Sequence, residues 1–186
     1  MTLTPRLIRA MNTAAVNHRD HVRKGSGIQY IAHLMAVHHL VAQYTDDEDV
    51  QIAALFHDTL EDVPERYSEQ DMRREYGDRV TDLVLHLSKR ELPGWRARAD
   101  AYLHHLEHDA PDEAVLISAA DKLHNLMSIL ADHAAQGDAL WGRFNSGRAQ
   151  QEWWYGEVHR VVEKRLPGHP LARRLGELVS SFPAEA

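Results

Sequence analysis

The chain has 186 residues, 44% of them hydrophobic and 26% charged, so it is long enough to bury one core, and we expect a single domain over residues 1–186. A net charge of -7 argues against a nucleic-acid partner, because backbone phosphates are bound by clustered lysine and arginine. No apolar run reaches the length of a bilayer span or a signal-peptide core, so we expect neither a membrane partner nor a signal peptide. The absence of cysteine excludes thiolate chemistry and agrees with a cytoplasmic location.

Apolar residues recur at helical spacing along most of the chain, and no stretch alternates as a strand does. Thr4 followed by Pro5 predicts the start of the first helix, and "RKGSG" (23–27) predicts its end. "SEQD" (68–71) resembles a capping box, which opens a short helix that ends at Gly77. The sequence therefore predicts an all-α bundle of about eight or nine helices, at about 4–18, 30–44, 47–63, 68–77, 80–87, 102–106, 112–133, 153–162 and 170–181.

The helix predicted at 47–63 carries the most unusual pattern. At 100° per residue, His57, Asp58, Glu61 and Asp62 gather on one side, opposite an apolar face. A solvated acidic face on an amphipathic helix would explain the carboxylates alone. However, no lysine or arginine lies on this face, and "IAALF" (52–56) is apolar all round, which predicts a central helix. An imidazole beside a carboxylate also suits a divalent ion.

Two other helices carry polar residues with two open interpretations. His33 shares the apolar face of the second helix, where a lone histidine is commonly a hydrogen-bonded core residue and less commonly a ligand. In the long helix at 112–133, Asp121 and Asn125 lie one turn apart on a polar strip, which solvent exposure alone would explain. Asn125 has the bearing to contact a ligand held at Asp121. A total of 14 histidines favours a metal without deciding it.

Three stretches, taken in order, resemble the signatures of HD-domain phosphohydrolases: "HRDHVRKGSGIQYIAHLMAV" (18–37), "ALFHDTLEDV" (54–63) and "AADKLHNL" (119–126). The resemblance is closest to the hydrolase domain of RelA/SpoT proteins and to small alarmone hydrolases, and it covers residues 8–162. The chain departs from the family pattern at "HRDH", where "HAGQ" is frequent, and at Gln29, where proline is frequent. Neither departure falls on a proposed ligand, and no synthetase domain is expected.

The resemblance implies a role for each matching residue. His33, His57, Asp58 and Asp121 would be the four ligands of one divalent ion, usually Mn²⁺. Glu61 and Asp62 would face the water at that ion. Arg23 and Lys24, which on their own read as a solvated loop, would reach the bound nucleotide. The resemblance also places the substrate-facing helix in the segment that holds Arg143, Arg148, Trp153 and Tyr155.

Within that segment, we favour Arg148 and Tyr155, which are seven residues apart and share one helical face. Aromatic residues at this spacing are, however, more often part of a core than a platform for a base.

The leading interpretation is a Mn²⁺-dependent hydrolase that removes pyrophosphate from the 3′ position of guanosine tetra- or pentaphosphate. Glu61 or Asp62 would orient the attacking water and accept its proton. An alternative within the same class is action on a deoxynucleotide, an adenosine alarmone or a dinucleotide phosphate. An alternative from another class is a non-catalytic nucleotide sensor or partner-binding helical module, although a binder has no need of the carboxylates. The sequence leaves the oligomeric state open.

Overall fold

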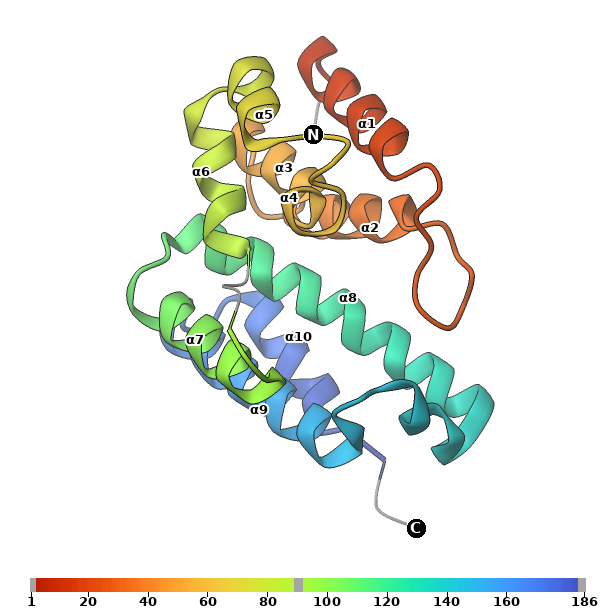
Figure 1. Ribbon diagram of the computed structural model, residues 1–186. Coiled ribbons are helices and arrows are strands. Elements are labelled where there is room, and N and C mark those ends of the chain that lie inside the picture. The colour runs from red at the N-terminus through yellow and green to blue at the C-terminus, as the bar shows by residue number, and fades with distance from the viewer. Residues whose placement is uncertain (1–2, 89–91, 184–186) are drawn as a thin grey trace. The chain divides into compact units, whose positions relative to one another are not determined.

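The computed structural model describes residues 3–88 and 92–183, and these residues contain helices and no strand (Figure 1). The all-α prediction is therefore confirmed. Within the described residues, the helices are α1 Pro5–Asn17, α2 Ile31–Val41, α3 Glu48–Phe56, α4 Thr59–Asp62, α5 Glu69–Tyr76, α6 Asp78–Leu87, α7 Trp95–His108, α8 Asp112–Gln136, the 3-10 helix η1 Gly137–Arg143, α9 Gly147–Arg165 and α10 Pro170–Val179.

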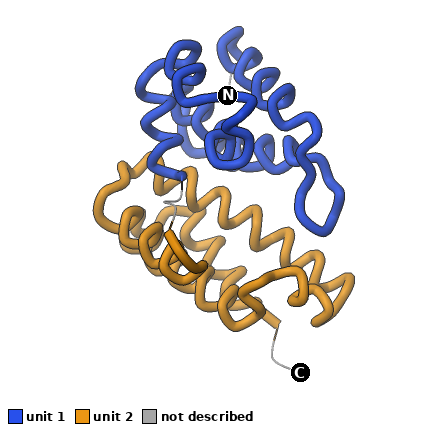
Figure 2. Tube along the Cα trace, in the orientation of Figure 1, with its two compact units in different colours: residues 1–89 blue, residues 90–186 orange. Residues whose placement is uncertain are grey.

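Contacts between residues divide the chain into two compact units, Met1–Lys89 and Arg90–Ala186 (Figure 2). Unit 1 holds α1 to α6, and unit 2 holds α7 to α10 with η1. The expectation of one domain over the whole chain stays a prediction.

Helix α3 is the centre of unit 1. It packs against α1, α2 and α6, and its residues 50–56 are all buried. This burial follows from the run "IAALF", because a helix that is apolar on every side must be covered on every side. The prediction of a central helix at this place is confirmed. The packing of α3 also fixes the position of its buried C-terminal end, from which the next residues continue.

Two helix starts in unit 1 follow from capping chemistry. Thr4 accepts a hydrogen bond from the backbone N–H of Leu7 through its side chain, and Pro5 takes the first helical position. Ser68 and Asp71 form the predicted capping box, in which each side chain accepts the other residue's backbone N–H. Gly77 ends α5 with a positive φ of 91°, a conformation that favours glycine.

Helix α8 is the centre of unit 2, where it packs against α9, α10 and η1. On length and composition alone, the segment Asp112–Arg143 would also pass as a helix able to cross a membrane, with a mean hydropathy of 1.2 in its most apolar stretch. That stretch is 67% buried, as expected for the core helix of a bundle, so the segment is weak evidence for a membrane span. Because α8 is packed into the core of unit 2, its orientation there is fixed, and so is the side of the helix that carries Asp121.

His38 on α2 is a buried histidine that adds a pH dependence to unit 1. Its Nδ1 lies 3.1 Å from the carbonyl oxygen of Gln51, which can only accept, so Nδ1 carries the proton. Burial lowers the pKa of His38 below its usual value, although the hydrogen bond to Gln51 opposes this. The unfolded chain therefore takes up a proton at a higher pH than the folded chain does.

We predict that this difference makes the protein less stable as pH falls below about 6.5, the usual histidine value. His38→Asn keeps a donor for Gln51 and removes the titrating ring, so its unfolding midpoint should fall less between pH 7 and pH 5 than that of the wild type. Denaturant unfolding in the presence of a chelator measures this. His104→Asn, at an exposed position on α7, is the control and should keep the wild-type slope. Equal slopes in all three proteins would contradict the assignment.

Candidate metal centre

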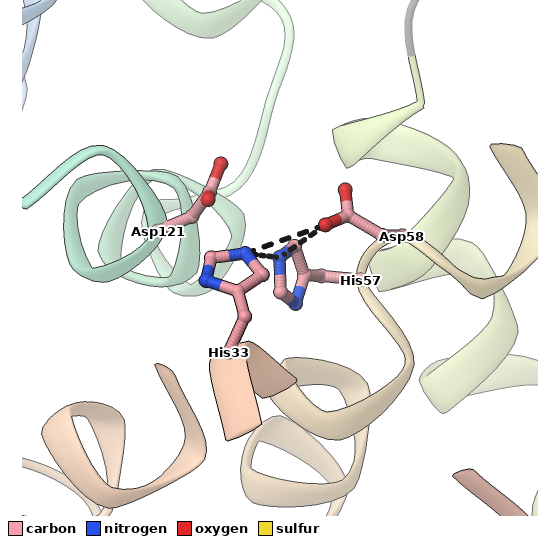
Figure 3. A group of neighbouring side chains, drawn as sticks. All are labelled: His33, His57, Asp58 and Asp121. Atoms are coloured by element: carbon pink, nitrogen blue, oxygen red, sulfur yellow. Dashed lines mark hydrogen bonds and ion pairs between the residues drawn. The ribbon is translucent and has the colours of Figure 1, made fainter. Parts of the chain in front are cut away.

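Three of the predicted ligands converge inside unit 1 (Figure 3). The Nε2 atoms of His33 and His57 lie 3.2 Å apart, and Asp58 Oδ2 lies 3.4 Å from the first and 3.0 Å from the second. Both imidazoles are buried, and the Asp58 side chain is 19% exposed. Helix α2 supplies His33, and the chain just after α3 supplies the other two residues. Figure 3 also draws Asp121, which belongs to unit 2.

The hydrogen bond on the far side of His57 fixes which of its nitrogens is available. His57 Nδ1 lies 2.8 Å from the carbonyl oxygen of Ala54, and since a carbonyl only accepts, Nδ1 must carry the proton. In a neutral imidazole, Nε2 then presents a lone pair toward Asp58. A lone pair facing a carboxylate oxygen at 3.0 Å is unfavourable unless a cation or a further proton lies between them. Two nitrogens and one oxygen are a suitable donor set for a divalent transition metal.

The local backbone supports the same charge preference. Helix α3 ends at Phe56 and α4 begins at Thr59, so the helix expected to run unbroken over 47–63 is interrupted at His57 and Asp58. Asp58 has φ −104° and ψ −3°, close to the sparsely populated region where many active-site residues lie. The carbonyl end of α3 carries partial negative charge, which favours a cation at this point. Helical periodicity in the sequence could not reveal this interruption, because Glu61 and Asp62 still follow Asp58 on a helix, α4, as expected.

The two carboxylates predicted to act on water lie on α4. Glu61 and Asp62 are both exposed, unlike the buried imidazoles. The pKa of Asp62 is raised to about 6, mainly by partial burial and then by the charge of Asp58, while His21 opposes the rise. His21 Nδ1 lies 3.9 Å from Asp62 Oδ2. Asp62 therefore belongs to the electrostatic surroundings of the three converging side chains while remaining open to solvent.

The "RKGSG" loop forms a closed turn in unit 1. Val22 and Gln29 form an isolated antiparallel bridge, and the backbone N–H of Arg23 donates to the carbonyl of Ile28 at 2.8 Å. Gly25 and Gly27 have φ values of 85° and 69°, which other residues rarely adopt, so the tight turn requires these glycines. Lys24 is exposed on this turn. The loop is therefore a defined platform that leads directly to α2 and His33.

Asp121 and Asn125 lie together on α8, in unit 2. Asn125 Nδ2 donates to Asp121 Oδ1 at 2.6 Å, which confirms that the two residues share a helical face. Asp121 is also ion-paired with Lys122, and both side chains are buried. Lys122 was not predicted from the sequence, and its neighbour relation to Asp121 was the available signal. The pairing provides the compensation that a buried carboxylate requires.

The two favoured residues of the substrate-facing segment are engaged inside unit 2. Arg148 Nε donates to Glu152 Oε1 at 2.8 Å, and the Arg148 side chain is 13% exposed. Tyr155 is buried, and its ring centroid lies 6.1 Å from that of Phe182. Their assignment to the substrate stays a prediction, since these contacts would also suit residues that stabilise the helix packing.

Trp153, another residue of the expected substrate-facing segment, lines a separate groove of about 390 Å³ between α7 and α9. The guanidinium carbon of Arg96 lies 3.6 Å from the centroid of the Trp153 ring. This cation–π contact gives Trp153 a structural partner on its own surface.

The sequence profile of the family described as "HD domain" matches residues 10–141. A guanosine-3′,5′-bis(diphosphate) 3′-pyrophosphohydrolase of Haemophilus influenzae is 33% identical over 111 residues, which cover 57% of this chain and 16% of the relative. The bifunctional (p)ppGpp synthase/hydrolase SpoT of Escherichia coli is 33% identical over 129 residues, 67% of this chain and 18% of the relative. This chain thus spans less than a fifth of the length of these curated relatives.

Solved structures show a similar fold. One, titled "A metazoan ortholog of SpoT hydrolyzes ppGpp and plays a role in starvation responses", matches with a TM-score of 0.81 at 24% identity, over 97% of each chain. Another, lmo0812 from Listeria monocytogenes, matches with a TM-score of 0.70 at 25% identity, over 80% of this chain and 96% of the other. These likenesses agree with the helical architecture described above.

We predict that a divalent ion stabilises the folded chain through the three converging side chains. At an ion concentration 100 times the dissociation constant, the gain in unfolding free energy should be about 2.7 kcal/mol. Thermal unfolding with Mn²⁺ or with a chelator measures this gain. His57→Ala should abolish it, and His39→Ala, at an exposed position on α2, should retain it. A gain of the same size in His57→Ala would show that the ion binds elsewhere.

Proposed function

This chain belongs to the HD-domain family, and we propose that it is a metal-dependent hydrolase that removes pyrophosphate from the 3′ position of guanosine tetra- or pentaphosphate. The observation that carries the proposal is the convergence of His33 Nε2, His57 Nε2 and Asp58 Oδ2 within 3.4 Å of one another. The similarity to the 3′-pyrophosphohydrolase of Haemophilus influenzae and to SpoT of Escherichia coli supports the choice of substrate. A cytoplasmic location and a small-molecule nucleotide partner belong to the same proposal.

We assign the fourth ligand to Asp121 because the stretch "AADKLHNL" resembles the family signature that supplies it. Asp121 would add a second carboxylate to the two imidazoles and Asp58. This mixed set of nitrogen and oxygen donors suits Mn²⁺, and it suits other first-row divalent ions as well. Lys122 and Asn125 would hold the Asp121 carboxylate in one orientation, since both contact its oxygens.

The protein's own side chains divide the remaining work. When bound, a divalent ion supplies Lewis acidity, which polarises a phosphoryl oxygen and acidifies water. Glu61 and Asp62 would orient the attacking water through their carboxylate oxygens and accept its proton. Both lie on α4, which begins directly after Asp58, so a short and rigid connection sets their position relative to the ligands.

The Arg23–Lys24 pair would capture the phosphates. The protein carries a net charge of -7, so a multiply phosphorylated nucleotide needs a local positive surface. The closed turn places Lys24 in solvent and joins it to the helix of His33 through only a few residues. The loop would bind substrate without entering the coordination sphere of the ion. Asn125, Arg148 and Tyr155 are the further residues that we propose for nucleotide binding.

The direct test of this proposal is an incubation of metal-loaded protein with a panel of nucleotides, followed by chromatography of the products. We expect guanosine tetraphosphate to give GDP and pyrophosphate, and a chelator to stop the reaction. The panel should include a deoxynucleotide, an adenosine alarmone and a dinucleotide phosphate. Cleavage of one of these with the guanosine 3′-pyrophosphate left intact would replace the proposed substrate. Binding without any cleavage would favour a nucleotide sensor.

We predict that Glu61→Gln and Asp62→Asn retain the ion and lose turnover. The loss in kcat should be on the order of a hundredfold or more, as for other positioned general bases. Elemental analysis and steady-state kinetics on the same samples separate the two effects. Glu65→Gln, an exposed change in the next turn of chain, should leave both quantities unchanged. Full activity in both carboxamide variants would exclude a carboxylate that activates water.

We predict that Lys24→Ala raises KM for the nucleotide by roughly fivefold, which corresponds to the loss of about 1 kcal/mol at an exposed site. The metal content should stay the same. The difference from the wild type should shrink as salt rises, because screening weakens the contact that was removed. Lys164→Ala removes a lysine that pairs with Glu107 in unit 2, and this control should keep the wild-type KM. A wild-type KM in Lys24→Ala at low salt would contradict the role of the loop.

A further inference from the structure

The hydroxyl of Tyr30 contacts the carboxylate of Asp58. Tyr30 Oη donates a hydrogen bond to Asp58 Oδ2 at 2.6 Å, a short distance that is typical of a donor bonded to an ionised acceptor. The accepting oxygen is the one that lies 3.4 Å from His33 Nε2 and 3.0 Å from His57 Nε2. Tyr30 also interacts with Asp62, and this interaction lowers the pKa of Asp62. One phenol therefore lies between a ligand carboxylate and a carboxylate proposed to act on water.

A stack of rings fixes the plane of Tyr30. Its ring lies face to face with His21, with centroids 3.9 Å apart and planes 10° apart. His18 lies nearly parallel to both rings, with its centroid 5.4 Å from that of His21 and 5.5 Å from that of Tyr30. Tyr30 also makes an edge-to-face contact with His33, with centroids 5.4 Å apart and planes 74° apart. With three ring contacts of this kind, the Tyr30 ring has little freedom to move its hydroxyl away from Asp58.

The backbone at Tyr30 joins this stack to the "RKGSG" turn. The backbone N–H of Tyr30 donates to the carbonyl of His21 at 2.8 Å, one step outside the bridge between Val22 and Gln29. The stacked residues His21 and Tyr30 thus lie opposite each other where the two ends of the turn meet. A displacement of the turn that carries Lys24 would be transmitted to the ring whose hydroxyl holds Asp58.

We propose that Tyr30 is a positioning residue of the metal centre, which holds the Asp58 carboxylate in its ligating orientation and links that carboxylate to the "RKGSG" turn. This inference rests on the proposed metal site and goes beyond it, because Tyr30 is not itself a ligand. A hydrogen bond to a ligating carboxylate fixes its rotamer and leaves its other electron pairs for the ion. Removal of such outer partners commonly weakens metal binding by about 10- to 100-fold.

The opposing explanation is that Tyr30 merely packs the start of α2. A packing role would lower stability in a variant and leave the affinity for the ion unchanged. Tyr30→Phe separates the two explanations, because it keeps the stacked ring and removes only the hydroxyl. Tyr67→Phe is the matched control, since Tyr67 Oη also donates to a carboxylate, that of Glu75, at 3.0 Å. In the sequence, α4 and the loop after it separate this pair from His57 and Asp58.

The experiment measures the dissociation constant of Mn²⁺ by calorimetry for the wild type, Tyr30→Phe and Tyr67→Phe, together with the visible absorption spectrum of each Co²⁺-loaded protein. We expect Tyr30→Phe to bind Mn²⁺ about 10- to 100-fold more weakly and to shift the Co²⁺ spectrum. Tyr67→Phe should match the wild type in both measurements. Wild-type affinity and spectrum in Tyr30→Phe would overturn the inference, even if that variant unfolds at a lower temperature.

Two further results complete the test. If Tyr30→Phe does not fold, His21→Ala takes its place, because it removes the face-on ring and leaves the hydroxyl, and it should weaken Mn²⁺ binding several-fold. Unchanged binding in His21→Ala would then overturn the inference. If the wild type itself binds no divalent ion, the proposed metal site fails and the role of Tyr30 fails with it. If instead the wild type and Tyr30→Phe bind Mn²⁺ equally tightly, the metal site stands and only the role of Tyr30 fails.

Discussion

The arrangement around His57 depends on one electrostatic constraint. Its Nδ1 is committed to the carbonyl of Ala54 at 2.8 Å, so its Nε2 faces the carboxylate of Asp58 at 3.0 Å with a lone pair. His33 Nε2 lies 3.2 Å from the same nitrogen. A cation among these three atoms turns an unfavourable contact into a favourable one. Helix α2 brings His33 to this point, and the end of α3 brings His57 and Asp58. The short helix α4 then carries the two neighbouring carboxylates.

The fold around the site follows from burial. Helix α3 is enclosed because it is apolar on every side, and its C-terminal end therefore delivers His57 and Asp58 to a fixed position in unit 1. The carboxylates of α4 follow at once in the chain and stay in solvent, where water can reach them. The closed "RKGSG" turn adds a local positive charge to an otherwise acidic protein. Three of the proposed ligands, the carboxylates proposed to orient water and the loop proposed to bind phosphate thus all belong to unit 1.

Much of this was readable from the sequence, for identifiable reasons. Thr4 with Pro5 and the Ser68–Asp71 box are local capping signals, and local hydrogen bonds decide both helix starts. The central position of α3 followed from its uniform apolarity. The interruption at His57 and Asp58 did not, because a two-residue break hardly disturbs helical periodicity. Neither could periodicity show the direction of the Tyr30 hydroxyl, which depends on rings brought together by the turn. His33 required a family resemblance, since a core histidine and a ligand histidine look alike in one sequence.

The measurement that tests the central claim most directly is X-ray diffraction from crystals grown with Mn²⁺, recorded on both sides of the manganese absorption edge. The account predicts one anomalous peak, bonded to His33 Nε2, His57 Nε2 and carboxylate oxygens of Asp58 and Asp121. His57 Nδ1 should keep its hydrogen bond to Ala54. A fully active crystal with no peak at these atoms, or with the only peak at other side chains, would contradict the account.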